Sequence, residues 1–443
     1  MAKHLSSPSW SRLPIPPESS RVVPAEGQLA AAVQDGTNML PFGAGRTYGD
    51  TCVNSDRTLI LSSHQNRILD FDAEKGRIRC GAGATLAEVH ACTLPAGWIV
   101  PSCPGTAHVT LGGMVAHDVH GKNHVHTGTI GLHVRGLRVV RSGEGAVNCS
   151  SRSNPELMRA TIGGLGLTGF IEEVDLQLRR CPAQVLRVER IRSRSLDETI
   201  RLLQSSQDHE YAFAWVDSFS IKGDFARCVL TRAASEPAGD PESSKRRERG
   251  SRISRAGRLI PAALFRPSVM RAFNRLYFAG RSPFGGDMQV GTTSLVEFLF
   301  PQDSMHPSNH LYGRRGVFGH HSLVPDAQGA RAVLERVSRR GDQSLVTVLK
   351  SFGGHGSPGY LSFTGGGISI ATGFLNGGAP TLRLLADLDG IVLDCGGKLY
   401  PAKDARMPRA AFERSFPGAG SFAQHVDPAF SSNFWRRVGA RVE

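Results

Sequence analysis

Three glycine-rich stretches in the N-terminal part of the chain contain the residue types that hold a phosphate. They are residues 43–50 (GAGRTYGD), 104–113 (PGTAHVTLGG) and 161–169 (TIGGLGLTG). Glycine lets the backbone come close to a ligand, and successive N–H groups can form a nest for an anion, to which Arg46 can add a charge-assisted contact. One such turn is typical of a plain loop, and the GxGxxG turn of a Rossmann fold is missing. Three together indicate a large, phosphate-bearing ligand gripped by backbone.

Histidines that could bind a metal follow the second loop. They are His117, His120, His124, His126 and His133. Neither the HExxH spacing nor cysteine partners accompany them, so we predict no metal site and favour a histidine beside a redox centre or a phosphate. The eight cysteines form no CxxC pair, which favours scattered reduced thiols over a disulfide framework.

Short strands and one helix must position these loops. Residues 86–94 predict a helix, with Thr85 as its N-cap. Four β-rich runs separated by glycine turns predict strands at 58–61, 77–80, 134–140 and 170–178. This interleaving indicates an α+β domain and not a regular βαβ series.

The texture changes near residue 183. Ser195 and Glu198 resemble a capping box that opens a helix over 195–206. Two further helices are predicted at 259–276 and from 381 to about 388, and 391–393 is a short apolar run. Further strands are predicted at 185–191, 212–218, 228–231, 292–299, 317–323, 345–350 and 368–374.

Length and composition restrict the class of protein. The chain has 443 residues, of which 40% are apolar and 21% charged, so it suits two globular domains and not a disordered chain. Lys and Arg outnumber Asp and Glu by 52 to 39, and this basic balance suits nucleic acid, anionic lipid or a phosphorylated small molecule. The N-terminus lacks the apolar region of a secretory signal, and no apolar run reaches the roughly 20 residues of a membrane span. We expect a chain that is soluble or lies on a membrane.

A basic segment at residues 235–258 is predicted to be mobile, and the apolar run 259–265 follows it. Two interpretations stay open, a solvated loop and a segment that docks on anionic lipid with its apolar residues in the interface. A nucleic-acid role is not predicted, because no accompanying fold motif is present.

Taken together, the motifs resemble the vanillyl-alcohol-oxidase type of FAD-dependent oxidoreductases, and within it the decaprenylphosphoryl-β-D-ribose 2′-oxidase family. The likeness covers residues 8–182 and 396–435, and the middle of the chain only loosely. The segments that carry it are 10–12 (WSR), 45–50 (GRTYGD), 109–113 (VTLGG), 120–124 (HGKNH), 163–169 (GGLGLTG) and 396–404 (GGKLYPAKD).

The resemblance implies an α+β architecture in which both chain ends form one FAD-binding domain of two subdomains. Residues 1–182 would form most of this domain, and residues 396–443 would return to it. Residues 183–395 would form an inserted α+β substrate domain built on an antiparallel sheet.

The resemblance also implies the cofactor contacts. Relatives that attach FAD covalently carry a histidine directly after the arginine of the first loop, where this chain has Thr47, so FAD is expected to bind noncovalently. The pyrophosphate would lie along 43–50 and 105–113, where N–H donors offset its charge. The implied cofactor-binding residues are Gly43, Ala44, Gly45, Arg46, Thr47, Tyr48, Gly49, Pro104, Gly105, Thr106, Thr110, Gly112, Gly113, His117, His120, Gly121, Asn123, His124, Gly164, Gly169, Ile171 and Tyr400.

Lys403 is the residue that we expect to activate or orient the substrate hydroxyl, and the other implied catalytic residues are His120 and Tyr48. Mycobacterial members carry a reactive cysteine where this chain has Ala371, and His321 replaces an active-site glutamine. Covalent inhibitors of that cysteine should therefore fail. The implied substrate-binding residues are Lys122, His321, Lys350, Ser369, Ala371 and Lys403.

The implied reaction is oxidation of the 2′-hydroxyl of a polyprenyl-phosphoryl ribose to a keto sugar, the first half of an epimerisation to arabinose for the cell envelope. A short-chain NAD(P)H-dependent keto-reductase would be the partner, and a quinone or oxygen would accept the electrons. The expected location is cytoplasmic, at the anionic inner face of the cell membrane. Two alternatives stay open: a flavoenzyme for a free polyol, sugar or sugar lactone, and a lipid-binding scaffold that has lost its cofactor.

Overall fold

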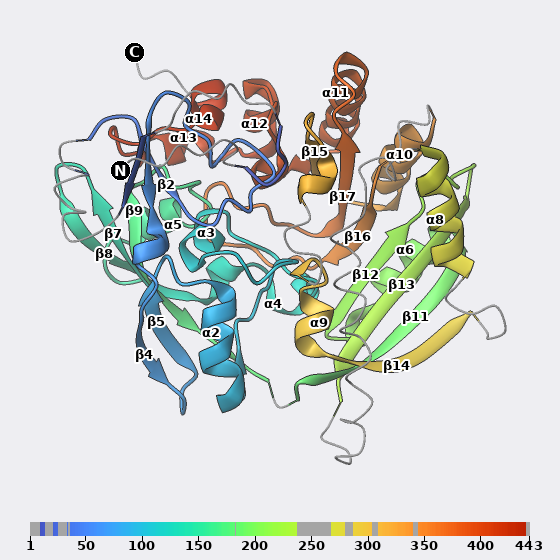
Figure 1. Cartoon of the computed structure of the whole chain (residues 1–443), viewed down its shortest axis with the longest axis horizontal. Coiled ribbons are helices and arrows are strands. Elements are labelled where there is room, and N and C mark those ends of the chain that lie inside the picture. The colour runs from blue at the N-terminus through green and yellow to red at the C-terminus, as the bar shows by residue number, and fades with distance from the viewer. Residues whose placement is uncertain are drawn as a thin grey trace.

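The computed structural model in Figure 1 describes most of the chain. The described residues are 9–13, 21–24, 33, 36–181, 183–236, 267–279, 287–303, 309–339 and 344–439. The predicted basic segment lies outside them beyond Glu236, and so does the apolar run that follows it. Their predicted mobility and lipid contact therefore stay predictions.

The N-terminal part of the chain forms a parallel three-stranded sheet and an antiparallel five-stranded sheet. The first has the order β1 (Arg21–Pro24), β3 (Thr58–Leu61), β2 (Met39–Phe42). The second has the order β4 (Ile68–Asp72), β5 (Arg77–Gly81), β9 (Phe170–Gln177), β7 (Val134–Arg141), β8 (Gly145–Ser150). Helices α2 (Leu86–Thr93), α3 (Leu111–Ala116), α4 (His124–Thr127) and α5 (Pro155–Thr161) accompany them, and β6 (Trp98–Ile99) pairs with β10 (Arg179–Arg180).

The rest of the described chain is built on one antiparallel sheet of eight strands, and its strands β11, β12, β13 and β14 lie on the right of Figure 1. Its order is β14 (Met288–Ser294), β11 (Val185–Ser195), β13 (Phe225–Ser235), β12 (Tyr211–Val216), β16 (Thr347–Phe352), β17 (Gly367–Leu375), β15 (Val317–Val324), β18 (Lys398–Leu399). The last strand comes from the C-terminal segment and pairs with β15. The C-terminal segment therefore extends this sheet as well as returning toward the first glycine loop; the domain boundaries themselves stay a prediction.

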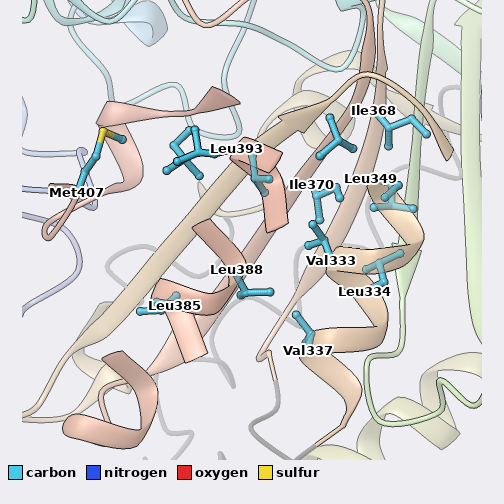
Figure 2. Packing of buried hydrophobic residues seen from close by; sticks show 14 of the residues in the cluster. Val333, Leu334, Val337, Leu349, Ile368, Ile370, Leu385, Leu388, Leu393 and Met407 are labelled. Carbon is cyan, nitrogen blue, oxygen red and sulfur yellow. The ribbon is translucent and has the colours of Figure 1, made fainter. Parts of the chain in front are cut away.

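Helices cover one face of the eight-stranded sheet and make the largest core. In Figure 2, Val333, Leu334 and Val337 of α10 (Ala327–Ser338) lie with residues of the sheet and of α11 (Ala379–Asp394). Side chains alternate across a strand, so the neighbours of these core residues in the strands must face the other way. The other α-helices among the described residues are α6 (Leu196–Gln204), α8 (Pro267–Ala279), α9 (Leu295–Leu299), α12 (Arg409–Ser415), α13 (Ala419–Ala423) and α14 (Asn433–Val438).

The opposite face of the sheet is the one that matters for the site. Leu349, Ile368 and Ile370 belong to the core, whereas Lys350 and Ala371, each next to one of them in sequence, line a cavity on the other side. One face of these strands is therefore apolar and filled by helices, and the other is available to a ligand.

Two of the predicted elements were wrong in part. Residues 292–299 were predicted as one strand, but β14 ends at Ser294 and α9 follows, because the Ser294 hydroxyl accepts from the backbone N–H of Glu297 at 3.2 Å and caps a helix. The C-terminal helix, predicted from 381 to about 388, is the longer α11 and absorbs the apolar run at 391–393.

The two predicted N-cap residues were confirmed. Thr85 caps α2, with the reciprocal contact from Glu88. Ser195 caps α6. Glu198 does not complete the predicted capping box, because its carboxylate accepts from the hydroxyl of Ser193 at 2.7 Å. In the described part of the chain, none of the helices has the length and apolarity that would let it cross a membrane.

Candidate functional site

A cavity of about 550 Å³ lies between the N-terminal loops and the free face of the eight-stranded sheet. Its volume is within the range of small-molecule sites. The first and second glycine loops form one wall, and the turn at 117–122 continues it. Strands β12, β15, β16 and β17 and the 3₁₀ turn η10 (Pro401–Lys403) supply the other wall. Segments far apart in sequence thus meet around one ligand-sized space.

The glycine loops are packed too closely for side chains at several positions. A Cβ on Gly43 would lie 2.4 Å from Oγ1 of Thr110, so the first two loops touch there. A Cβ on Gly49 would lie 1.9 Å from the carbonyl oxygen of Asp404. Gly45 adopts a φ of 63°, in the left-handed region that favours glycine. Backbone therefore forms this wall of the cavity, which fits the predicted cradle for a bulky phosphorylated cofactor.

Arg46 is the cation of the first loop. Its Nε donates to the carbonyl of His108 at 3.2 Å, and its guanidinium lies 4.5 Å from the ring centroid of Trp10. Burial lowers its pKa, and the nearby carboxylate of Asp303 acts in the opposite direction. An arginine remains charged at such values, so Arg46 brings one positive charge to the loop wall.

Asp303 was not predicted from the sequence, yet it lies against the second loop. It accepts hydrogen bonds from the Thr106 hydroxyl and from the backbone N–H of Ala107, the latter at 2.8 Å. One amide of the loop predicted to hold the pyrophosphate is therefore already paired with a carboxylate. No sequence motif predicts this contact, because Asp303 is distant in sequence from both Thr106 and Ala107.

Three lysines line the cavity, and each is partly buried. Burial lowers the pKa of Lys403 to about 7, with a smaller contribution from the charge of Lys350. Burial alone lowers the pKa of Lys350 to about 8. Lys403 Nζ lies 3.8 Å from the ring centroid of Tyr48, whose electron-rich face favours the cation. Near neutral pH, both lysines are thus poised between a cation and a neutral amine.

Lys122 has partners of its own. Its Nζ donates to the carbonyl oxygens of Phe298 and Leu299, at 2.5 and 3.0 Å, at the C-terminal end of α9. Burial lowers its pKa to about 7, and the charge of Lys350 adds to this shift. Helix α9, which was predicted as part of a strand, therefore holds one of the predicted substrate-binding lysines.

His120 and His321 meet inside the cavity, with ring centroids 5.0 Å apart. Burial holds the pKa of each well below its ordinary value, and nearby Lys350 adds to both shifts, so both rings are neutral. His321 Nε2 lies 2.7 Å from the hydroxyl of Ser369. Within the described part of the chain, the Nδ1 atoms of both histidines are buried without a hydrogen-bond partner. Buried polar atoms are normally paired, so these two atoms point to a ligand.

Tyr48 and Tyr400 add phenol hydroxyls to the cavity lining, and Tyr312, which does not line the cavity, contacts Tyr48. The hydroxyl of Tyr48 lies 3.1 Å from that of Tyr312, and the hydroxyl of Tyr400 donates to the carbonyl of His117 at 3.0 Å. Burial raises the pKa of all three phenols, so they stay protonated at neutral pH. Tyr312 is a further residue that sequence reasoning missed.

Most of the predicted site residues line this cavity. They are Gly43, Ala44, Gly45, Arg46, Thr47, Tyr48, Pro104, Gly105, Thr106, Thr110, Gly112, Gly113, His117, His120, Gly121, Lys122, Gly169, Ile171, His321, Lys350, Ala371, Tyr400 and Lys403. Their contacts with cofactor and substrate remain predictions. The structure brings them together around one space.

The other predicted residues do not line the cavity; they are Gly49, Asn123, His124, Gly164 and Ser369. Asn123 donates from Nδ2 to the carbonyl of Pro101 at 2.8 Å, and so holds the turn that carries His120. His124 stacks on Phe352 with centroids 3.8 Å apart. Ser369 reaches the site only through the ring of His321. In this structure, these residues support the lining rather than form it.

Metal ligands are not gathered at this site. No group of three or more His, Cys, Asp or Glu side chains that could hold a metal ion occurs among the described residues. The histidines that follow the second loop instead have separate neighbours, such as Phe352 for His124 and the carbonyl of His209 for His126.

Comparisons with known proteins agree with this arrangement. A sequence family described as FAD binding domain matches residues 26–150, which contain the first two glycine loops. The chain is 28% identical to a decaprenylphosphoryl-beta-D-ribose oxidase of Mycolicibacterium smegmatis over 425 residues, 92% of this chain and 90% of that protein. It is 31% identical to an uncharacterized protein in the mprA 5′ region of Streptomyces coelicolor over 374 residues, 80% of this chain and 100% of that protein. An L-gulonolactone oxidase of Mus musculus is 26% identical over 189 residues, 42% of each chain.

Proposed function

Because the chain belongs to the vanillyl-alcohol-oxidase type of FAD-dependent oxidoreductases, we propose that it oxidises the 2′-hydroxyl of a polyprenyl-phosphoryl ribose to a 2′-keto sugar. Its relatives and its FAD-binding domain make it a flavoenzyme that oxidises a CH–OH group. The sugar and its lipid phosphate are our proposal. Support comes from the relative of M. smegmatis, whose name states a decaprenylphosphoryl ribose and whose match spans 92% of this chain.

The observation that carries the proposal is a group of three partly buried lysines around the cavity, of which Lys350 stands on the free face of the sheet. Lys122, Lys350 and Lys403 line one cavity, where burial lowers the pKa of each. Taking a charged amine out of water is unfavourable, so an anion bound among these lysines stabilises their charged form. A phosphate supplies that charge. A free polyol or a neutral lactone does not, and this disfavours the alternative substrates.

The residues present fit FAD, which we propose binds noncovalently. The backbone of 43–48 and 104–113 would hold the pyrophosphate, and Gly169, Ile171 and Tyr400 would lie against the remainder of the cofactor. Thr47 has a hydroxyl where covalently flavinylated relatives carry a histidine, and a threonine cannot form that link. When bound, the flavin accepts a hydride from the carbon that bears the hydroxyl.

Residues of the chain must then take the hydroxyl proton. We assign this role to Lys403, whose lowered pKa leaves a neutral amine available near pH 7. Tyr48 lies under this amine and fixes its position. The unpartnered Nδ1 atoms of His120 and His321 would orient the sugar hydroxyls. Lys350 would hold the phosphate, and Lys122, whose amine donates to the carbonyls of Phe298 and Leu299, would lie beside the substrate. The rings of Phe352 and Tyr400 pack against His120.

The place of the reaction follows from the proposed substrate. A short-chain NAD(P)H-dependent keto-reductase would reduce the ketone from the other face, which gives net epimerisation to the arabinose form for the cell envelope. A quinone or oxygen would reoxidise the flavin. Since the substrate carries a polyprenyl chain, we propose that the protein works in the cytoplasm at the anionic inner surface of the cell membrane.

A visible spectrum of the purified protein tests the proposal directly. We expect an oxidised-flavin band that bleaches when polyprenyl-phosphoryl ribose is added without oxygen, because hydride transfer reduces the flavin. Acid precipitation should leave all flavin colour in the supernatant, since no covalent link is expected. A yellow protein that bleaches only with a free polyol or lactone would overturn the lipid substrate. A protein that stays colourless with added FAD would support the scaffold alternative instead.

The pH dependence of kcat/KM should be bell-shaped. A neutral Lys403 is needed to accept the proton, so activity rises as the pH rises through about 7. A charged Lys350 is needed to hold the phosphate, so activity falls as the pH rises through about 8. A phosphodiester does not titrate in this range, so both limbs belong to the protein. Steady-state rates from about pH 5.5 to 9.5 measure the profile.

The Lys350→Met variant tests which lysine causes each limb of the pH profile of kcat/KM. It should remove the alkaline limb and raise KM. It should also shift the acid limb to higher pH, because the charge of Lys350 is one cause of the lowered pKa of Lys403. An unchanged profile in this variant would contradict both assignments.

A further inference from the structure

Apolar side chains lead out of the cavity along the free face of the eight-stranded sheet. Val346 and Val348 line the cavity, and Val346 is 52% exposed. Val348 is the direct cross-strand partner of Trp215 on β12. Directly opposed residues of an antiparallel pair point to the same face, so Trp215 continues the wall that Val348 begins.

Helix α8 carries this apolar surface further. The ring of Tyr277 packs edge-on against Trp215, with centroids 4.8 Å apart, and Phe273 stacks on Tyr277 at 6.2 Å. Leu276 lies one turn from Phe273 on the same helix. Figure 1 shows α8 lying against the strands of the sheet beside β13. Val346, Val348, Trp215, Tyr277, Phe273 and Leu276 together form what we call the aromatic strip.

The outer end of the strip is unusually exposed for such side chains. Phe273 is 57% exposed and Leu276 70%, the highest values among the large apolar residues in the described part of the chain. By contrast, Asn274 and Phe278 of the same helix are buried, and Asn274 donates to the carboxylate of Asp217 at 2.8 Å. The helix is thus anchored by one face and presents apolar side chains on another.

The two ends of this surface differ in chemistry. At the inner end, Lys350 follows Val348 on the same face of β16 and is a partly buried lysine whose pKa of about 8 leaves it charged at neutral pH. At the outer end the strip is apolar and reaches the protein surface. One molecule that matches both ends is an amphiphile with an anionic head and a long apolar chain.

We propose that the aromatic strip is the binding site for the apolar chain of the substrate, with the phosphate held at Lys350 and the chain running past Trp215 to α8. This inference rests on the proposed function for the identity of the head group as a sugar phosphate. The binding of the apolar hydrocarbon chain does not depend on it. The occupant to which we commit is a single isoprenoid or similar chain attached to a phosphate. A bilayer surface and a second copy of the protein are outcomes that the test distinguishes.

Titration of the FAD-loaded protein with two phosphates tests the strip without any turnover. Farnesyl phosphate has head and chain, whereas methyl phosphate has the head alone. We expect calorimetry to give clearly tighter binding of farnesyl phosphate, and Phe273→Glu or Leu276→Glu to reduce this preference by roughly tenfold, because a charge there opposes burial of the chain. Leu382→Glu is the matched control, since Leu382 is 42% exposed on α11. It should keep the preference.

A second readout places the chain at the inner part of the strip. Tryptophan emission should change when farnesyl phosphate binds and should not change with methyl phosphate. Trp215→Phe should abolish this change while the other three of the four tryptophans remain.

Three outcomes would overturn the strip. The wild type could show no preference for farnesyl phosphate, or the α8 variants could keep the preference as well as the control does. The same variants could also lose binding to phosphatidylglycerol vesicles, or lose self-association, without any loss of the farnesyl preference, which would assign the surface to a bilayer or a second copy.

If farnesyl phosphate binds as expected but polyprenyl-phosphoryl ribose does not bleach the flavin, the strip stands and the proposed reaction fails. If the lipid sugar is oxidised but the α8 variants behave as the control, the reaction stands and the strip fails.

Discussion

Lys403→Ala is expected to lower kcat by about 10²–10⁴-fold while FAD stays bound, which is the usual range for loss of a general base. The amine is buried, its pKa is lowered to about 7, and it lies over the ring of Tyr48. Burial lowers the pKa of Lys122 to a similar value, but its amine donates to the carbonyls of Phe298 and Leu299, and Lys350 is assigned to the phosphate. Stopped-flow measurement of flavin reduction under single-turnover conditions reports the step directly.

Two further variants sharpen this test. Lys403→Arg keeps the positive charge but cannot provide a neutral amine, so it should stay as slow as the alanine variant. Lys398→Ala is the matched control, because Lys398 is a partly buried lysine on β18 that donates to the carbonyl of Thr364 at 3.0 Å and does not line the cavity. Near-normal turnover of Lys403→Ala with bound FAD would sink the assignment.

Gly49→Ala is the second change for which we expect a large effect. The new Cβ would lie 1.9 Å from the carbonyl oxygen of Asp404, so backbone must move. That backbone is shared with the site, since the N–H groups of Tyr48 and Gly49 donate to the carbonyl of Ala402 at 3.1 and 3.3 Å. The methyl group should separate Tyr48 from Lys403 and open the first loop. We expect FAD content to fall more than about tenfold and the free energy of unfolding to drop by about 2–4 kcal/mol.

The control for this change is another glycine. A Cβ on Gly291, in the edge strand β14, would meet no atom within 4 Å, and its φ is ordinary. Gly291→Ala should therefore keep FAD and stability. Flavin absorbance relative to protein absorbance gives the FAD content, and denaturant unfolding gives the stability. A Gly49→Ala protein as yellow and as stable as Gly291→Ala would show that the two segments do not depend on this contact.

The sequence alone determined the features that depend on neighbouring residues. Thr85 and Ser195 were predicted as N-caps, because a hydroxyl before an apolar helical pattern satisfies the free N–H groups of the first turn, and both cap helices in the structure. The strands predicted between the glycine turns were confirmed as well, as at 134–140 within β7, because a β-rich run bounded by turn residues is also a local pattern. The strand predicted at 292–299 was wrong where a cap at Ser294 outweighed the β-prone pattern.

The resemblance of short motifs went further than local physics. It predicted the family, the cofactor and the residues that line the cavity, and the family and FAD were confirmed. Single residues in those motifs were assigned less accurately. Asn123 and His124 stand in the shared segment 120–124 but lie behind the cavity wall, because successive residues of a tight turn point in different directions.

Only the tertiary structure decided which distant residues meet. Lys350 lies on β16 and Lys403 in a turn of the C-terminal segment, and the pKa of Lys403 is lowered mainly by burial and further by the charge of Lys350. Asp303 and the aromatic strip likewise arise from contacts between elements far apart in the chain. The alternation of residues along a strand predicts which face of the strand is apolar. Which element packs against that face depends on long-range contacts in the folded chain. That packing determines what lies in the cavity and what leads out of it.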